Sequence, residues 1–166
     1  MKLKICESNY PQEVKDAIFA YTAQGGNLAS KYPFGVSQTE TLKNYLDSNT
    51  ITLDCNIYRG IWMSDKQWEE VFYNWYDGKN EPFKMRPFNS FTKDEHRAHG
   101  YGNGGDEFVL LVIEKGTTLK ALDLGDDTMY KEEEEILVAN DTFYIKNIDI
   151  VRYSSATVYL TNKRGV

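Results

Sequence analysis

Apolar residues recur at helical spacing near the start of the chain. We expect a helix that begins at Pro11, which suits a first helical turn, and that ends at Gly25-Gly26. Its apolar positions follow one another at i, i+3, i+4 and i+7: Val14, Ala17, Ile18 and Tyr21. This spacing places the side chains on one face and predicts a helix packed on a core.

Capping-box spacing, in which a serine precedes a glutamate or glutamine by three residues, predicts further helices. Ser37 stands in this relation to Glu40, and Ser64 to Gln67. The apolar stripes behind these serines are Leu42, Tyr45 and Leu46 in the earlier helix and Trp68, Val71, Phe72 and Trp75 in the later one. We expect both stripes to be buried as core and the later helix to end at Asp77-Gly78.

Between these helices, residues 51–60 change to an alternating pattern. Every second residue is apolar as far as Ile57, as in a half-buried strand. Arg59 has the inward parity, where a guanidinium either pairs with a carboxylate or faces a cleft that holds an anion. The pattern alone leaves both roles open.

The second half of the chain is typical of strands. Residues 88–92 predict a strand that delivers Thr92 to the N-cap of a short helix reaching Ala98, because Thr92 and Glu95 again have capping-box spacing. The continuous apolar run 108–113 predicts a central strand, and further strands are expected at 119–124, 136–139, 143–150 and 157–160. The expected fold class is α+β, with a helical first half and roughly five to seven strands in the second.

Length and charge limit the range of functions. The chain has 166 residues and a formal net charge of -6, which fits one domain, residues 1–166, and argues against a broad basic face that binds nucleic acid stably. Cys6 and Cys55 are too far apart for a disulfide framework or a zinc site, so we expect both to be reduced and buried and no metal to be bound. Without a signal peptide or a membrane-spanning run, we expect a cytoplasmic protein that has no membrane partner.

The sharpest local feature is an acidic run, Tyr130-Lys-Glu-Glu-Glu-Glu135, which leads into the strand expected at 136–139. Such a run is most often a solvated face. If Glu135 begins the strand, however, alternation puts Glu133 on the same side as Glu135. Neighbouring carboxylates repel, so the pair can divide into a charged stabiliser and a proton acceptor, as cleavage of a glycosidic bond requires.

The motifs, in this order, resemble the mono-ADP-ribosyltransferases of the arginine-serine-glutamate class, which include bacterial toxins and phage-encoded enzymes. Tyr58-Arg59-Gly60 at a strand end resembles the first motif of that family. Ser90-Phe91-Thr92 resembles its Ser-Thr-Ser motif, with Phe91 and Thr92 as departures from the pattern. Tyr130, Glu133 and Glu135 resemble the closing aromatic-x-x-Glu-x-Glu motif, and the gaps of 31 and 45 residues between Arg59, Ser90 and Glu135 suit the family.

The resemblance implies a fold in which a helical N-terminal half meets two packed, mostly antiparallel β-sheets around a cleft for NAD. It also implies roles for the motif residues. Arg59 would contact the NAD diphosphate, and the backbone at Gly60 would approach the nicotinamide amide. Ser90 would position Glu135, which would bind the ribose and stabilise the oxocarbenium ion. The remaining NAD contacts would come from Tyr58, Phe91 and Thr92.

For the acceptor, the resemblance implies that Glu133 orients or deprotonates an arginine on a target protein, with Tyr130 as a further contact to that target. The expected function is an NAD-dependent protein-arginine mono-ADP-ribosyltransferase that releases nicotinamide, in the form of a monomeric phage effector or bacterial toxin. Other possibilities stay open: an NAD glycohydrolase, an ADP-ribosyltransferase that modifies nucleic acid, and a non-catalytic module that keeps the fold.

Overall fold

The computed structural model describes residues 10–24, 33–100, 105–125, 134–152 and 155–163. The elements of this part of the chain are α1 (Gln12–Thr22), α2 (Val36–Ser48), β1 (Thr50–Thr52), β2 (Ile57–Met63), α3 (Asp65–Tyr76), β3 (Phe88–Thr92), α4 (Glu95–His99), β4 (Glu107–Ile113), β5 (Thr118–Asp123), β6 (Glu135–Ala139), β7 (Tyr144–Arg152) and β8 (Ser155–Thr161). Helices dominate the first half and strands the second, so the expected α+β class is confirmed.

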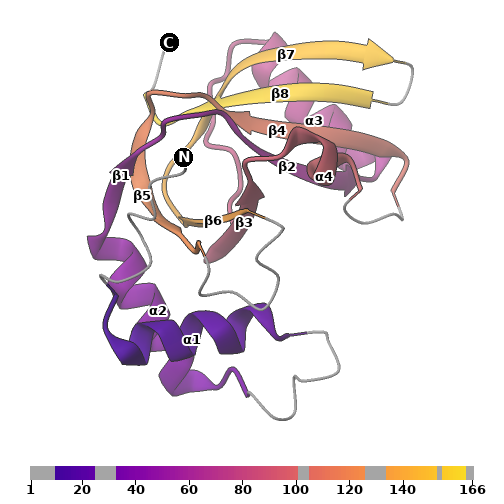
Figure 1. Cartoon of the computed structure of the whole chain (residues 1–166). Coiled ribbons are helices and arrows are strands. Elements are labelled where there is room, and N and C mark those ends of the chain that lie inside the picture. The colour runs from indigo at the N-terminus through magenta and orange to yellow at the C-terminus, as the bar shows by residue number, and fades with distance from the viewer. Residues whose placement is uncertain (1–9, 25–32, 101–104, 126–133, 153–154, 164–166) are drawn as a thin grey trace.

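The strands form one hydrogen-bonded sheet in the order β1-β5-β6-β3-β2-β4-β8-β7. Neighbouring strands are antiparallel except β4 and β8, which run parallel. In the middle of the order, β2 and β3 are in register at Tyr58 and Thr92. Figure 1 shows the sheet strongly curled about this junction, with β1, β5, β6 and β3 in one half and β2, β4, β8 and β7 in the other. The packed sheets that the resemblance implied are therefore the halves of one curled sheet.

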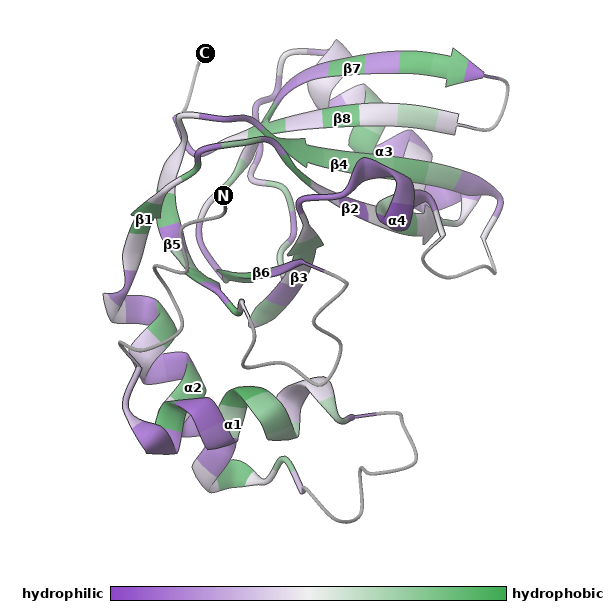
Figure 2. Cartoon of the chain, viewed as in Figure 1, coloured by the Kyte–Doolittle hydropathy of each residue, from purple (hydrophilic) through white to green (hydrophobic). Residues whose placement is uncertain are grey.

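Helices α1 and α2 lie together beside β5 and β6 (Figure 1). Their apolar stripes meet these strands in one buried cluster: Val14, Ala17, Ile18, Leu42, Leu46, Leu122, Leu124, Leu137 and Ala139. The aliphatic residues of both stripes are thus confirmed as core, whereas Tyr21 and Tyr45 are only partly buried against the cluster. Figure 2 shows a contrast in hydropathy further along the chain, where β4 is hydrophobic and the short helix α4 is hydrophilic. No helix within the described ranges has the length and apolar character that crossing a bilayer requires.

Helix α3 packs more loosely than the sequence predicts, because none of its residues is buried. Its stripe of Trp68, Val71, Phe72 and Trp75 is only partly buried against the large core cluster on the sheet. The expectation of a buried face is therefore wrong for this helix. A cavity of about 850 Å³ lies between α3, β2 and residues 79–86, so the side chains of the stripe are not enclosed on every side.

The helix caps confirm one expected capping box and correct the others. Ser64 caps α3 with Gln67 as predicted. The N-cap of α2 is Gly35 instead of Ser37, and the Gln38 side chain accepts a hydrogen bond from the Gly35 N–H. The N-cap of α4 is Asp94 instead of Thr92. Thr92 remains the last residue of β3 because it pairs there with β6, and its hydroxyl accepts from the Asp94 N–H at 3.1 Å.

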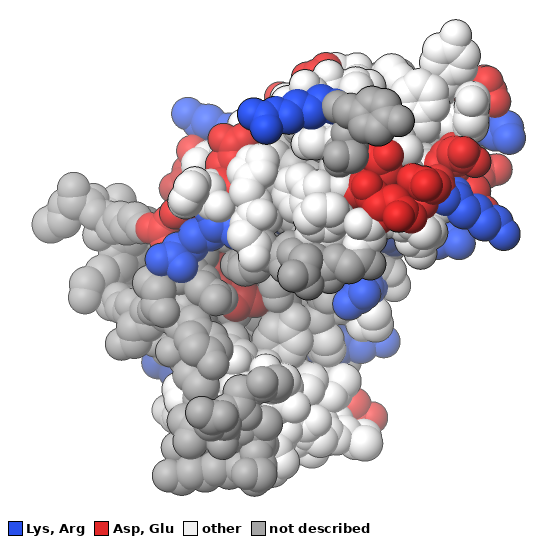
Figure 3. Space-filling model, turned by 90° about the vertical axis from the view of Figure 1, so that its right-hand side faces the viewer, with Lys and Arg blue, Asp and Glu red and all other residues white. Residues whose placement is uncertain are grey.

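Acidic side chains gather where β2 ends and β4 begins. Asp65 donates its N–H to Oδ2 of Asp106 at 3.2 Å. The pKa of Glu107 is raised by burial and by the negative charges of Asp65 and Asp106. Figure 3, a view onto this side of the molecule, shows acidic groups close together and the basic ones scattered. The described part of this face therefore presents no continuous basic surface to a polyanion.

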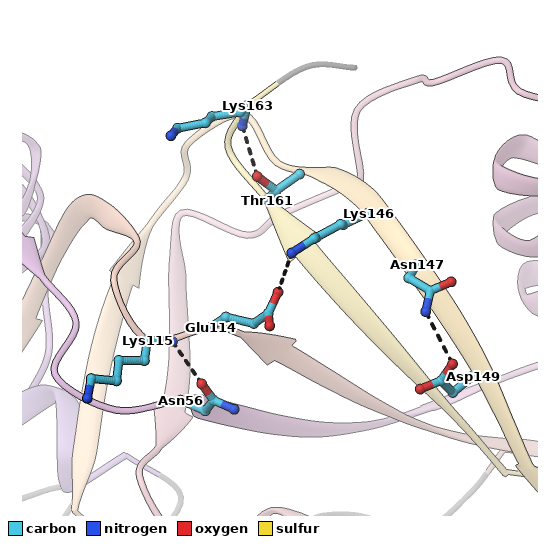
Figure 4. A network of polar contacts seen from close by, with 8 residues as sticks. All are labelled: Asn56, Glu114, Lys115, Lys146, Asn147, Asp149, Thr161 and Lys163. Atoms are coloured by element: carbon cyan, nitrogen blue, oxygen red, sulfur yellow. Dashed lines mark hydrogen bonds and ion pairs between the residues drawn. The ribbon is translucent and has the colours of Figure 1, made fainter. Parts of the chain in front are cut away.

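The alternating segment 51–60 forms β1 and β2 with a bend between them, so the expectation of one strand is wrong. The bend lies beside the turn between β4 and β5, because β2 pairs with β4 and β1 pairs with β5. Asn56 accepts from the Lys115 N–H at 2.8 Å in this turn, and Glu114 beside it pairs with Lys146 of β7 (Figure 4). Cys55 lies in the bend and is half-buried, not buried as expected, and Cys6 lies outside the described residues.

Candidate active site

Ser90 and Glu135 meet on adjacent strands. In the antiparallel register of β3 and β6, Thr92 lies opposite Glu135 and Ser90 lies opposite Leu137. The Ser90 hydroxyl donates a hydrogen bond to Oε2 of Glu135 at 2.6 Å. Glu135 is only 8% exposed, and burial without a donor would make its charged form costly. The Ser90 hydroxyl therefore helps to hold a buried carboxylate in place.

Arg59 joins this pair through the backbone of β3. Its Nη1 donates to the carbonyl oxygen of Ser90 at 2.8 Å. The sequence left open whether Arg59 would pair with a carboxylate or face a bound anion. The structure shows a further partner, the backbone carbonyl of Ser90. Arg59, Ser90 and Glu135, which are far apart in the sequence, are thus brought together as expected, with Ser90 in contact with both of the others.

Tyr21 is a site residue that the sequence reasoning missed. Its hydroxyl lies 3.0 Å from Oγ of Ser90. Burial and the negative charge of Glu135 raise the pKa of Tyr21, while the bond to Ser90 and the charges of Arg59 and Arg86 act in the opposite direction. The helical stripe did place Tyr21 on the inner face of α1. The available signal was a hydroxyl at the end of an otherwise aliphatic stripe.

Arg86 is a further cationic residue near the site that the sequence reasoning missed. The segment that carries it is tied to β3, because Asn89 accepts from the Arg86 N–H at 2.9 Å and donates to the Arg86 carbonyl at 2.6 Å. Asn89 also donates to the Val138 carbonyl of β6 at 3.1 Å. Burial raises the pKa of the nearby Tyr21 phenol overall, and the positive charge of Arg86 acts weakly against this rise. Arg59 and Arg86 thus give this region positive charge.

The packing of α4 against β2 explains why residue 60 is a glycine, which the resemblance did not explain. A Cβ placed on it would lie 1.9 Å from the carbonyl oxygen of Ala98, the fourth residue of α4. Glycine is therefore required for α4 to sit against β2 at this distance. The approach of nicotinamide to the same backbone stays a prediction.

The other residues expected to bind NAD are mostly packed. Phe91 is 1% exposed in the large core cluster, and Thr92 is fully buried. Tyr58 is partly buried against the cluster that contains Ala98 and Phe108. Direct contacts of Phe91 and Thr92 with NAD stay a prediction, and such contacts would have to come from their backbone atoms, since their side chains are enclosed.

Glu133 and Tyr130 lie outside the described residues, so their expected roles stay predictions. The described chain resumes at Glu134, whose φ is +48°, in the left-handed region. Strand geometry therefore begins at Glu135, as expected. The alternation that suggested Glu133 on the same side as Glu135 does not extend through Glu134.

The cavity beneath α3 lies on the other face of β3 from the Ser90 hydroxyl. Arg59, Arg86 and Asn89 are among its lining residues, and Ser90 and Glu135 are not. Since neighbouring residues of a strand point to opposite faces, Asn89 faces the cavity while Ser90 faces Tyr21 and Glu135. The side chains of Tyr21, Ser90 and Glu135 therefore meet on one face of β3, and Arg59 and Arg86 reach the cavity on the other.

The fold resembles solved ADP-ribosyltransferases. ADP-ribosyltransferase HopU1 of Pseudomonas syringae matches with a TM-score of 0.65 and 16% identity over 93% of this chain and 78% of that one. C3stau2 from S. aureus, solved with NAD, matches with a TM-score of 0.61 and 14% identity over 93% and 89%. The ADP-ribosyltransferase Vis from Vibrio splendidus, in complex with agmatine, matches with a TM-score of 0.53 and 15% identity over 93% and 68%.

The likeness is one of fold. No protein-family model matches the sequence, and neither does any curated protein. The identities are low, yet the matches span nearly the whole chain and share one architecture. The chain therefore has the fold of the ADP-ribosyltransferases, as its motifs indicated.

Proposed function

We propose that this chain, which has the ADP-ribosyltransferase fold, is an NAD-dependent mono-ADP-ribosyltransferase that transfers ADP-ribose to a protein side chain and releases nicotinamide. The observation that carries the proposal is the hydrogen bond of 2.6 Å from Ser90 to the buried carboxylate of Glu135, with Arg59 bound to the Ser90 backbone. These residues are the ones that the motifs singled out. The structure of C3stau2 with NAD supports NAD as the co-substrate of this fold.

The buried carboxylate is the group that the chemistry needs. When the bond between ribose and nicotinamide breaks, positive charge develops on the ribose. A fixed negative charge stabilises that charge most where water is excluded, and Glu135 is 8% exposed and held by Ser90. Nicotinamide is already cationic in NAD, so its departure requires no strong acid from the protein. Glu135 therefore has the role of electrostatic stabiliser.

The guanidinium groups suit the diphosphate of NAD. Arginine recognises phosphate oxygens through a planar set of donors and keeps its charge at any physiological pH. Arg59 is fixed by its bond to the Ser90 carbonyl, and Arg86 belongs to a segment that Asn89 ties to β3. We assign diphosphate binding to Arg59, with Arg86 as a second positive charge.

Arginine is the acceptor that we propose. The resemblance assigns acceptor choice to Glu133, and a carboxylate suits a guanidinium. The Vis structure contains agmatine, which carries a guanidinium group, and this supports an arginine-like acceptor for the fold. In this proposal Glu133 orients the guanidinium toward the ribosyl cation, and Tyr130 contacts the target protein.

Labelled NAD and a cell lysate test the transfer. We expect the native protein to label lysate protein and Glu135→Gln to lose at least about 100-fold in rate, because it lacks the charge opposite the developing cation. Glu114→Gln is the matched control, since Glu114 forms a remote ion pair with Lys146, and it should retain full activity. Equal labelling by the native and Glu135→Gln proteins contradicts the proposal.

A second substitution tests the acceptor. Glu133→Gln should lose transfer to arginine, measured with agmatine as a small acceptor, and should retain part of the nicotinamide release to water. Normal transfer to agmatine by this variant would refute the role of Glu133. Nicotinamide release by the native protein without any transfer would identify the chain as an NAD glycohydrolase instead.

A further inference from the structure

We infer that Tyr21 is a positioning residue that orients the Ser90 hydroxyl toward Glu135. The inference rests on the proposed function, since the effect on catalysis passes through Glu135. It adds a residue from α1, outside the recognised motifs, to the side chains that set the geometry of the site. The Tyr21 hydroxyl lies 3.0 Å from Oγ of Ser90, and that Oγ lies 2.6 Å from Oε2 of Glu135.

The direction of the hydrogen bonds follows from counting protons. A serine hydroxyl carries one proton, and Ser90 donates that proton in its hydrogen bond to Oε2 of Glu135. The lone pairs of Ser90 Oγ then remain for Tyr21, which must be the donor in the bond of 3.0 Å. The donated hydrogen bonds therefore run in one direction, from Tyr21 to Ser90 and from Ser90 to Glu135. Consecutive bonds in one direction polarise each other, so the phenol strengthens the bond that Ser90 gives to the carboxylate.

The neighbouring charges favour the donor form of Tyr21. Burial and the negative charge of Glu135 on β6 raise the pKa of the phenol, and these outweigh Ser90, Arg59 on β2 and Arg86, which act to lower it. The phenol therefore keeps its proton throughout the neutral range. A hydroxyl that keeps its proton can serve as a permanent donor.

Packing fixes the position of the Tyr21 ring. The centroid of the ring lies 5.5 Å from that of Phe34 and 5.6 Å from that of Phe88, both in inclined arrangements. Phe88 is on β3, two residues before Ser90 and on the same face of the strand. The backbone of α1 is held in turn by the buried residues Val14, Ala17 and Ile18. The hydroxyl thus approaches Ser90 from a ring with little freedom to move.

Tyr21→Phe tests the inference, since it removes the hydroxyl and keeps the ring. We expect kcat for NAD cleavage to fall about five- to tenfold, with KM for NAD changed less than about twofold, because the lost bond acts on Glu135 and not on bound NAD. Tyr45→Phe on α2 is the matched control. Tyr45 packs at the margin of the same cluster, and its ring pairs with Tyr10 at 5.6 Å, so kcat should be unchanged.

A double-mutant cycle separates positioning from a general loss of structure. Ser90→Ala removes the hydroxyl that accepts the hydrogen bond of Tyr21. Adding Tyr21→Phe to this variant should therefore lower kcat no further. An equal further loss in the Ser90→Ala background overturns the inference. So does an unchanged kcat in Tyr21→Phe, or an effect confined to KM, which would mean that Tyr21 contacts NAD directly.

Unfolding measurements test the same geometry without any activity. The loss of stability caused by Tyr21→Phe should fall by at least half in the Ser90→Ala background, because Ser90 is the partner of the lost hydroxyl. Equal losses in both backgrounds overturn the inference. A native protein that neither transfers ADP-ribose nor cleaves NAD would refute the proposed function while this unfolding cycle still decides the Tyr21-Ser90 contact.

Discussion

At the scale of the residue, the absence of a side chain at Gly60 decides how closely α4 approaches β2. A Cβ there would lie 1.9 Å from the Ala98 carbonyl oxygen and 3.0 Å from Cε2 of Phe108. The first distance is far shorter than a van der Waals contact. The Ala98 oxygen belongs to the backbone, so it cannot rotate away as a side chain could. Arg59, which holds Ser90, is the preceding residue, so a shift of α4 and β2 at this point also disturbs the site.

Gly60→Ala should therefore destabilise the protein by about 1–3 kcal/mol or more, since overpacking of a rigid contact forces the backbone to move. Denaturant unfolding measures this loss. Gly100→Ala is the matched control at the end of the same helix, because among the described residues a Cβ there meets only the Arg97 carbonyl oxygen, at an ordinary 3.4 Å. If Gly60→Ala were as stable as Gly100→Ala, the close contact with Ala98 would be wrong.

At the scale of the element, the first turns of α2 and α3 show what a capping box requires. Each helix has a serine at the expected spacing. Ser64 accepts from the Gln67 N–H at 3.2 Å, and its own N–H donates to the Gln67 side chain at 3.0 Å. Ser37 lies inside the first turn of α2, after the N-cap Gly35. Only one of these serines therefore satisfies a free backbone N–H at its helix end.

Ser64→Ala should lower the free energy of unfolding by about 1 kcal/mol, because the cap is lost. Ser37→Ala should change it by less than about 0.5 kcal/mol, since an alanine within a helix is well tolerated. Chemical denaturation of both variants gives the comparison. A larger loss for Ser37→Ala than for Ser64→Ala would contradict the observed cap positions.

At the scale of the whole molecule, several groups on separate elements hold their protons more tightly in the folded chain. Burial raises the pKa of Tyr21 and of Tyr159 above 10.0. For Lys93, burial lowers the pKa, but the hydrogen bond of 2.7 Å to Asp123 and the negative charges of Asp123 and Asp54 together outweigh it, so the pKa lies above its ordinary value. Between the unfolded and the folded pKa values, the folded state binds more protons than the unfolded state.

The free energy of unfolding should therefore be constant through neutral pH and fall as the pH rises above about 10. The fall should be shallower in Tyr21→Phe, which has no phenol to ionise at this position. Denaturant unfolding between neutral pH and pH 11 measures both curves. A stability that increases over this alkaline range would refute the raised pKa values.

The sequence by itself determined most of the elements and singled out the motif residues of the candidate site. Helical spacing placed α1 and α2 on the core, and strand parity placed Arg59 with the inward set that includes Ile57. The motifs singled out Arg59, Ser90 and Glu135, which the structure brings together. These predictions succeed because backbone conformation and burial follow from periodic patterns within a few neighbouring residues.

Only the tertiary structure decided which distant residues meet. Tyr21 reaches Ser90 across 69 positions, and nothing in its helical stripe names that partner. The bend between β1 and β2 exists because β4 and β5 turn at the same place, and alternation along one strand carries no record of its neighbours. The close contact of Gly60 with α4 has the same origin. Such contacts depend on how the sheet curls and pairs, which is a property of the whole chain and of no local pattern.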